Sequence, residues 1–324
     1  MGWMNLFKKK NNKPVSENSN ESFESGNLKV IVLSDLGNIR TNNEDRGMYF
    51  KIADENVIRE KGQMLIVADG MGGHQAGEVA SKMAAEIISR EYFNQTGNGS
   101  VEKNLAKVFA LANKNIFEMS RSNKAYNGMG TTCTALVVID QTVYYAQVGD
   151  SRAYIQKGDS ILQITEDHTY VQELVKSGDI TPEEAATHPK RNILTNAMGT
   201  KPDLRIDTGK CSLAFENNDR LLLCSDGLYD YLNDKELNEI LSKNLLKEAA
   251  EYMVNQAKAR GGHDNITVVL AEKTGAQKET EAGLKLTRDI DLPKLTRDAD
   301  QYPSLILILL LFLCGLLFFL PIQR

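Results

Sequence analysis

Short apolar runs recur through the middle of this chain, and most of them stop abruptly at a polar turn. The runs at 28–33, 65–68, 133–139, 143–148, 153–156, 221–224 and 266–270 have the length and composition of buried strands. Apolar positions at helical spacing predict helices around 79–88 and 105–119, and two more helices are expected at 234–242 and 246–259. The pattern therefore predicts a globular domain of strands and helices over residues 27–273 of the 324.

The two ends of the chain differ from this domain. Residues 1–26 are rich in Asn, Ser, Glu and Lys, carry no secretory signal, and are expected to be a disordered leader. Residues 274–302 form a predicted polar linker in which Leu-Thr-Arg-Asp occurs twice, either as a neutral spacer or as a docking site for a phosphorylated threonine.

Residues 303–322 are predicted to be a C-terminal transmembrane anchor. Leu305 to Leu320 is apolar on every face and lies at the short end of the length that spans a bilayer. The alternative is a buried core helix, which would be expected to show one apolar stripe. Basic residues are slightly more frequent on the domain side of the segment, which favours a cell-membrane protein with a cytoplasmic domain.

Composition excludes some classes of function. The net charge is -5, so the basic surface typical of a general nucleic-acid binder is not expected. The four cysteines, Cys133, Cys211, Cys224 and Cys314, form no Cys-x-x-Cys pair. A disulfide framework or a zinc site is therefore not expected, and a reducing compartment fits best.

Acidic residues stand at the ends of four predicted strands. They are Asp69 with Gly70, Asp150 after Gly149, Asp226 with Gly227, and Asp264 with Asn265, and the loop after the first strand adds Arg40, Glu44 and Asp45. One such residue is commonplace as a turn former. Several clustered carboxylates raise each other's pKa unless a cation neutralises them, and oxygen ligands without cysteine favour Mg²⁺ or Mn²⁺. Two such ions can hold a bridging water, and an arginine can hold a phosphate, so the set predicts metal-assisted hydrolysis of a phosphate ester.

Six motifs occur in order along the chain, namely SDLGNIRTNNED, VADGMGGHQAGE, GMGTT, VGDSRAY, CSDGLYD and GGHDNITVV. They resemble those of bacterial protein serine/threonine phosphatases of the 2C type, the metal-dependent protein phosphatases, over roughly residues 28–272. The resemblance implies an α+β fold. It is a four-layer α/β/β/α sandwich of two antiparallel sheets flanked by helix pairs, with the metal ions at one end between the sheets.

The resemblance also implies roles for single residues. Asp69 would bridge two Mg²⁺ or Mn²⁺ ions, the carbonyl of Gly70 would be a ligand, and Asp226 and Asp264 would complete the first ion's ligands. Asp45, with Glu44 as a further candidate, would hold waters on the second ion. Asp150 with Asp226 matches the third, weaker metal position of bacterial members, and Arg40 matches the phosphate-binding arginine.

Two further features follow from the same comparison of motifs. The polar stretch at 167–198 matches a mobile flap that shapes substrate access. Eukaryotic relatives have Asp-Gly-His where this chain has Asp69-Gly70-Met71. His74 is offset by three residues and is not taken as a replacement, so the proton donor for the leaving group is hypothesised to be a metal-bound water.

The predicted function is hydrolysis of phosphoserine and phosphothreonine in proteins by a metal-bridging water. The enzyme would be membrane-anchored and would oppose a bacterial Ser/Thr kinase, with that kinase and its phosphorylated substrates as partners and no nucleic acid. Two alternatives remain at this stage. One is a catalytically inactive, membrane-tethered module that binds phosphoproteins, and the other is a phosphohydrolase for small molecules.

Overall fold

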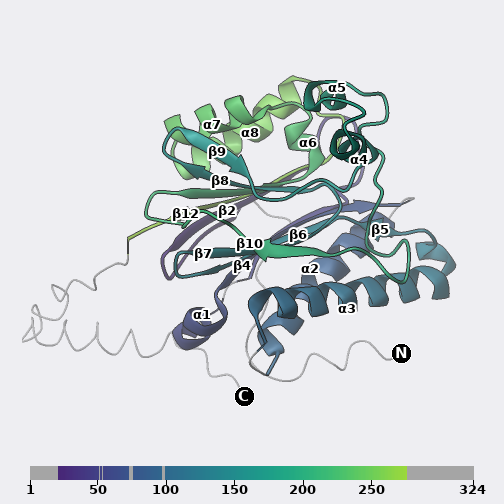
Figure 1. Ribbon diagram of the computed structural model, residues 1–324, viewed down its shortest axis with the longest axis horizontal. Coiled ribbons are helices and arrows are strands. Elements are labelled where there is room, and N and C mark those ends of the chain that lie inside the picture. Colours follow the sequence, from purple (N-terminus) through teal and green to yellow (C-terminus); the bar gives the residue numbers. More distant parts are fainter. Residues whose placement is uncertain (1–20, 51, 53, 73–75, 97–98, 276–324) are drawn as a thin grey trace, which may run out of the picture. The chain divides into compact units, whose positions relative to one another are not determined.

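Two antiparallel β-sheets lie face to face in the middle of the computed structural model (Figure 1), which describes residues 21–50, 52, 54–72, 76–96 and 99–275. The first sheet consists, in spatial order, of β1 (Glu21–Ser25), β2 (Leu28–Asp35), β12 (Ile266–Lys273), β11 (Arg220–Cys224), β8 (Arg152–Lys157) and β9 (Ser160–Gln163). The second consists of β10 (Asp207–Lys210), β7 (Thr142–Val148), β6 (Cys133–Ile139), β4 (Gln63–Met71) and β3 (Asp45–Phe50), and the short β5 (Gly130–Thr131) pairs with the end of β4.

Helices cover the outer face of each sheet (Figure 1). The second sheet is covered by α2 (Ala76–Asn94) and α3 (Val101–Ser122), and the first by α7 (Asp234–Lys243) and α8 (Leu246–Ala259). The shorter helices are α1 (Glu55–Lys61), the 3-10 turn η1 (Lys124–Tyr126), α4 (Tyr170–Ser177), α5 (Pro182–Ala186) and α6 (Asp226–Tyr229). The predicted four-layer sandwich of two antiparallel sheets and helix pairs is therefore confirmed for the described part of the chain.

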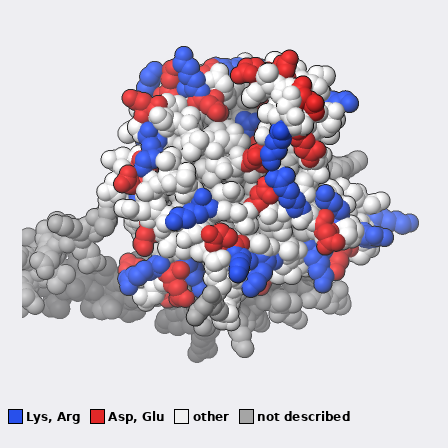
Figure 2. All heavy atoms as spheres, in the orientation of Figure 1, with Lys and Arg blue, Asp and Glu red and all other residues white. Residues whose placement is uncertain are grey.

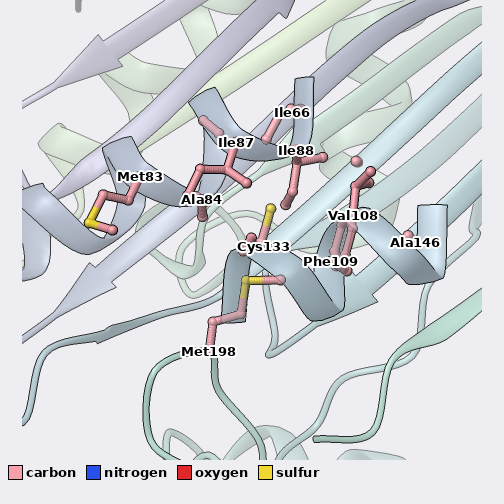
Figure 3. Close-up of a cluster of buried hydrophobic side chains, with 14 of the residues drawn as sticks. Ile66, Met83, Ala84, Ile87, Ile88, Val108, Phe109, Cys133, Ala146 and Met198 are labelled. Carbon is pink, nitrogen blue, oxygen red and sulfur yellow. The ribbon is translucent and has the colours of Figure 1, made fainter. Parts of the chain in front are cut away.

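The side chains of β4 show why its apolar run is continuous. Leu65 and Val67 belong to the cluster between the two sheets, whereas Ile66 and Ala68 belong to the cluster under α2 and α3. Figure 3 shows Ile66 in that second cluster, with Ile88 and Phe109 among its neighbours. Successive strand residues point to opposite faces, so a strand covered on both faces must be apolar at every position. Each of the larger buried side chains, Leu65, Ile66 and Val67, contributes about 1.5–3 kcal/mol to stability.

The leader was predicted to extend to residue 26, and the structure corrects this boundary. Residues 21–25 form β1, which pairs with β2, and Phe23 is buried against Tyr49 with ring centroids 5.4 Å apart. Phe23 is the only apolar residue of this edge strand, so the polar composition of the segment conceals it. Residues 1–20 lie outside the described residues.

The three cysteines in the described part of the chain, Cys133, Cys211 and Cys224, are buried free thiols. Among the helices within the described ranges, none has the length and hydropathy needed to cross a membrane. The predicted anchor at 303–322 and nearly all of the predicted linker at 274–302 lie outside those ranges.

Candidate metal centre

Strand register brings the predicted acidic residues to one end of the sandwich. In the second sheet, Asp45 at the start of β3 lies directly opposite Asp69 near the end of β4. In the first sheet, the end of β11 pairs with the beginning of β12, so the residues that follow β11 and precede β12 share an edge. Those residues include Asp226 and Asp264. The last of the set, Asp150, follows β7, whose final residue pairs with the first residue of β6 at the same end.

Asp69 lies at the centre of this cluster. Its backbone N–H donates to Thr132 Oγ1 at 2.9 Å, and its carbonyl accepts from the Thr132 N–H at 2.9 Å and from Thr131 Oγ1 at 2.8 Å. Burial raises the pKa of the Asp69 carboxyl well above its usual range, and four neighbouring carboxyls add to the shift, those of Asp45, Asp226, Asp150 and Asp264. The backbone is thus fixed by the Gly-Thr-Thr strand end, while the side chain faces other negative groups.

Asp45 is buried and held by a serine from the other sheet. Ser225 Oγ donates to Asp45 Oδ2 at 2.6 Å and accepts from the Thr267 N–H at 3.0 Å. Burial raises the pKa of Asp45 to about 6, and the hydrogen bonds from Ser225 and Thr267 oppose the shift. Asp45 was expected on a loop, but it is the first residue of β3. Because Ser225 directly precedes Asp226, its hydrogen bond links Asp45 to the turn that carries Asp226.

Asp226 supplies the observation that tests whether the site suits a cation. Its Oδ1 is buried and has no hydrogen-bond partner among the described residues. Burial raises the pKa of this carboxyl well above normal, and Asp150 and Asp264 are the strongest of the neighbouring charges that add to the shift. A buried carboxylate oxygen without a donor is costly, and ionised neighbours have no proton to donate. A cation bound there would remove both costs.

The donor set consists of oxygen atoms. In the described part of the chain, no three His, Cys, Asp or Glu side chains converge closely enough to enclose a metal ion by themselves. Mg²⁺ usually keeps several water ligands and is held directly by one or two carboxylates. The residues present therefore fit Mg²⁺ or the similar Mn²⁺, with part of the coordination supplied by water.

Arg40 lies beside Asp264, with Nη2 at 2.6 Å from Oδ2, although 50% of its side chain is exposed. The hydrogen bond that Arg40 donates to Asp264 is the largest cause that raises the pKa of Arg40, and the charges of Asp69 and Glu44 also raise it. In the structure this arginine forms its ion pair with Asp264. Exposed ion pairs of this kind contribute only about 0–1 kcal/mol, so the guanidinium can change partners at little cost.

The loop that carries Arg40 is docked onto the loop before β12. Asn265 Nδ2 donates to the carbonyls of Leu36 and Asn42, each at 3.0 Å, and the Asn38 N–H donates to the Gly262 carbonyl at 2.7 Å. Gly37 has φ +76°, and a Cβ there would lie 2.1 Å from the Asp264 carbonyl oxygen. Sequence reasoning quoted Asn265 within a motif but gave it no role, although it fixes the arginine loop relative to Asp264.

Glu44 has a firmly held backbone. Its N–H donates to Asn265 Oδ1 at 2.8 Å, and its carbonyl accepts from the Gly70 N–H at 3.1 Å and from Ser81 Oγ at 2.6 Å. The carboxylate lies against the first turn of α2, since a Cβ on Gly77 would be 2.3 Å from Glu44 Oε2. Burial raises the pKa of Glu44. The Glu44 carboxylate can orient a water bound to a metal ion, as the sequence predicts, or it can interact with the N-terminus of α2.

Asp150 is buried next to a charged pair that sequence reasoning missed. Arg152 holds Asp167 with Nε at 3.0 Å and Nη2 at 2.7 Å from Oδ2, and its guanidinium lies 3.6 Å from the centre of the Tyr229 ring. Burial raises the pKa of Asp150 to about 7, Asp167 adds to the shift, and a hydrogen bond from Tyr229 opposes it. The position of Arg152 inside the motif VGDSRAY was the available signal.

The remaining sequence predictions concern the flap and His74. The stretch at 167–198 that was matched to the flap contains α4 and α5 separated by turns. Its two ends are joined by an isolated bridge between Thr169 and Leu194. His74 lies outside the described residues.

Comparison with known proteins agrees with this geometry. The sequence profile of the family "Protein phosphatase 2C" matches residues 50–271. The serine/threonine phosphatase stp of Listeria innocua is 42% identical over 253 residues, which cover 77% of this chain and 97% of that protein. The crystal structure of the serine/threonine phosphatase Stp1 from Staphylococcus aureus has a TM-score of 0.67 at 34% identity and covers 81% of this chain and 100% of its own.

A further solved structure is the catalytic domain of the serine threonine protein phosphatase PstP in complex with 2 manganese ions. Its TM-score is 0.63 at 32% identity, and it covers 76% of this chain and 99% of its own. The enzyme class predicted from the sequence, a serine/threonine protein phosphatase, is thereby confirmed. The chain belongs to the protein phosphatase 2C family.

Proposed function

We propose that this phosphatase removes phosphate from phosphoserine and phosphothreonine in proteins and uses Mg²⁺ or Mn²⁺ as its cofactor. The observation that carries the proposal is the buried, unpartnered oxygen of Asp226 among other carboxyls, at the end of the sandwich where Arg40 lies. The names of the relatives, and the two manganese ions in the PstP structure, support it.

Different residues of the chain would hold the metal ions and orient the water molecules around them. Ions bound at this end would activate a water molecule and neutralise the phosphoryl oxygens. Asp69, the Gly70 carbonyl, Asp226 and Asp264 would hold the first ion, Asp45 and Glu44 would orient waters around a second, and Asp150 with Asp226 would hold a third. Ser225 donates to Asp45 Oδ2 and would keep this carboxylate oriented within the site.

Arg40 would bind the substrate phosphate. Its guanidinium is half exposed and is held at the site by its ion pair with Asp264. A cation held by Asp264 would compete with Arg40 for that carboxylate, which would leave the guanidinium free to bind the phosphate. Arginine presents a fixed fork of donors that matches phosphate oxygens, which a lysine does not.

Enzymatic assay of the full chain tests this function. We expect hydrolysis of a phosphothreonine peptide in the presence of Mn²⁺, loss of hydrolysis with a chelator, and recovery when Mn²⁺ is restored. Faster turnover of small phosphometabolites than of phosphopeptides would favour a small-molecule phosphohydrolase. Binding of the phosphopeptide without turnover, at any Mn²⁺ concentration, would favour the inactive binding module.

We also propose that the domain acts in the cytoplasm against a bacterial Ser/Thr kinase and is anchored by residues 303–322. The apolar pattern of that segment supports the anchor. Figure 2 shows acidic and basic side chains interspersed over the face in view, whereas nucleic-acid binding usually requires a basic face. Proteins phosphorylated by the kinase, rather than nucleic acid, are therefore the partners we propose.

The anchor leads to a prediction about fractionation. The full chain should sediment with membranes and resist extraction by high salt, because apolar burial in a bilayer is not weakened by ionic screening. A chain ending at Asp300 should be soluble and keep its turnover, since every proposed ligand precedes the linker. Cell fractionation followed by phosphopeptide assay measures both. Release of the full chain by salt alone would contradict the anchor.

A further inference from the structure

His168 is a buried histidine at the beginning of the flap, and the proposed mechanism does not use it. Only 3% of the residue is exposed. Its backbone N–H donates to the Gly149 carbonyl at 2.9 Å, and its ring Nδ1 accepts from the Gly149 N–H at 3.1 Å. His168 therefore holds both polar groups of the residue that precedes Asp150.

The same histidine also holds the far end of the flap. The Thr195 N–H donates to the His168 carbonyl at 2.9 Å, and Asn196 Nδ2 lies 2.9 Å from His168 Nδ1. Asn196 Nδ2 donates in addition to the Arg205 carbonyl at 2.8 Å, which fixes the orientation of the amide. Both ends of the flap thus meet at one side chain.

The hydrogen bonds determine the tautomer of the ring. Two donors, the Gly149 N–H and Asn196 Nδ2, face Nδ1, so Nδ1 is an acceptor and carries no proton. The proton is then on Nε2, which lies 3.1 Å from Asp207 Oδ2 on β10 and donates to it. The neutral ring has one donor and one acceptor, and both are used.

Gly149 has little freedom to move away from this contact. Its φ is +102°, and a Cβ would lie 2.5 Å from Thr132 Cβ. Thr132 therefore packs closely against Gly149, and His168 holds the Gly149 backbone by hydrogen bonds. Because Asp150 follows directly and is itself buried, the placement of its carboxylate depends on how Gly149 is held.

We propose that His168 is a positioning residue that couples the flap to Asp150. Its ring and backbone hold the Gly149–Asp150 loop, and its carbonyl and Nδ1 hold the end of the flap. The inference rests on the proposed function, because Asp150 affects catalysis there only by helping to hold a metal ion. Coupling of this kind is reciprocal, so filling the ion position at Asp150 should order the flap, and loosening the flap should weaken that position.

Two substitutions distinguish the roles of the two ring nitrogens of His168. His168→Asn places an amide oxygen near the position of Nδ1 and keeps the acceptor for Gly149, whereas His168→Gln reaches toward Nε2 and loses that acceptor. His188→Gln is the matched control, because His188 is a flap histidine whose Nδ1 accepts from the Lys190 N–H instead. The measurements are Mn²⁺ binding by calorimetry and hydrogen exchange of residues 169–195 in the full chain.

We expect His168→Gln to weaken the weakest class of Mn²⁺ sites by roughly tenfold or more, as loss of an outer-shell partner does, and to speed exchange in the flap. His168→Asn and the control should stay near the wild-type values. Equal losses in His168→Asn and His168→Gln, following a shared fall in melting temperature, would overturn the proposal, because the ring would then only fill space.

The wild-type protein gives a test that does not depend on a variant folding. Exchange at the Tyr170 and Thr195 amides should slow as the weakest Mn²⁺ site fills, since these N–H groups bond the Ile193 and His168 carbonyls. Exchange rates at these two amides that do not change as the site fills would overturn the proposed coupling, but not the proposed function. Failure of the wild-type protein to bind Mn²⁺ at all would overturn the proposed function and this inference with it.

Discussion

Asp69→Asn is expected to lower phosphopeptide turnover by at least roughly a hundredfold, the effect of losing a principal electrostatic element. Asparagine preserves the size of the side chain, and the backbone bonds to Thr131 and Thr132 are unaffected. What is lost is the negative charge at the centre of the cluster, which in our proposal would help to hold the first ion. Steady-state kinetics with Mn²⁺ measures the loss.

The same variant should be no less stable than the wild type without metal. Burial and four neighbouring carboxyls raise the pKa of Asp69, which means that its ionised form is unfavourable in the folded state near neutral pH. A neutral amide removes that penalty, so the melting temperature without metal should stay the same or rise. The stabilisation that Mn²⁺ gives the wild type by binding the folded state should shrink in the variant.

Asp140→Asn is the matched control for this substitution. Asp140 is an exposed aspartate in the turn between β6 and β7, with φ +52°, a backbone conformation that asparagine also accepts readily. It should retain both turnover and the Mn²⁺ response. Near-normal Mn²⁺-dependent turnover in Asp69→Asn would show that Asp69 is not a principal ligand.

The strand-end aspartates could be predicted because their signal is local. A buried strand covered on both faces is a run of apolar residues, and the first carboxylate after it, as at Asp69 or Asp226, is conspicuous. Antiparallel pairing then brings such ends together, as in the pair of Asp45 and Asp69. The sandwich itself was predicted from the family resemblance, since apolar runs do not determine the order of strands.

The contacts that support the site could not be predicted, because the residues that make them are distant in sequence. Arg40 bonds Asp264 across 224 positions, and Ser225 bonds Asp45 across 180. Those contacts depend on strand register and on how one loop docks on another, and neither leaves a periodic pattern in the sequence. His168 is similar, since its partners come from the loop after β7, from the end of the flap and from β10.

Arg40→Ala is expected to lower kcat/KM for a phosphopeptide by roughly ten- to more than a hundredfold, because charge-assisted hydrogen bonds are worth about 1.5–3 kcal/mol. Arg40→Lys should recover part of the loss through its charge, but not the paired geometry. Metal affinity should be unchanged or slightly higher in Arg40→Ala, since Asp264 is released from its ion pair. Kinetics and Mn²⁺ calorimetry on both variants measure these effects.

A purely structural arginine would behave differently. If Arg40 served mainly to hold Asp264 in place, its removal would weaken Mn²⁺ binding and lower the melting temperature, and the loss of kcat/KM would follow the loss of metal. Gly37→Ala imitates that case, because a Cβ 2.1 Å from the Asp264 carbonyl oxygen must displace the whole loop. Gly158→Ala controls for backbone strain, since Gly158 also has a positive φ, +54°, but nothing lies within 4 Å of an added Cβ.

The comparison of these variants decides the role of Arg40. Gly37→Ala should weaken both Mn²⁺ binding and kcat/KM, because it moves the arginine loop and Asp264 relative to each other, whereas Gly158→Ala should affect neither. Arg40→Ala should separate the two quantities by lowering kcat/KM while Mn²⁺ affinity holds. If Arg40→Ala matched Gly37→Ala in both measurements, the arginine would be a structural partner of Asp264. Unchanged kinetics in Arg40→Ala would remove it from the site altogether.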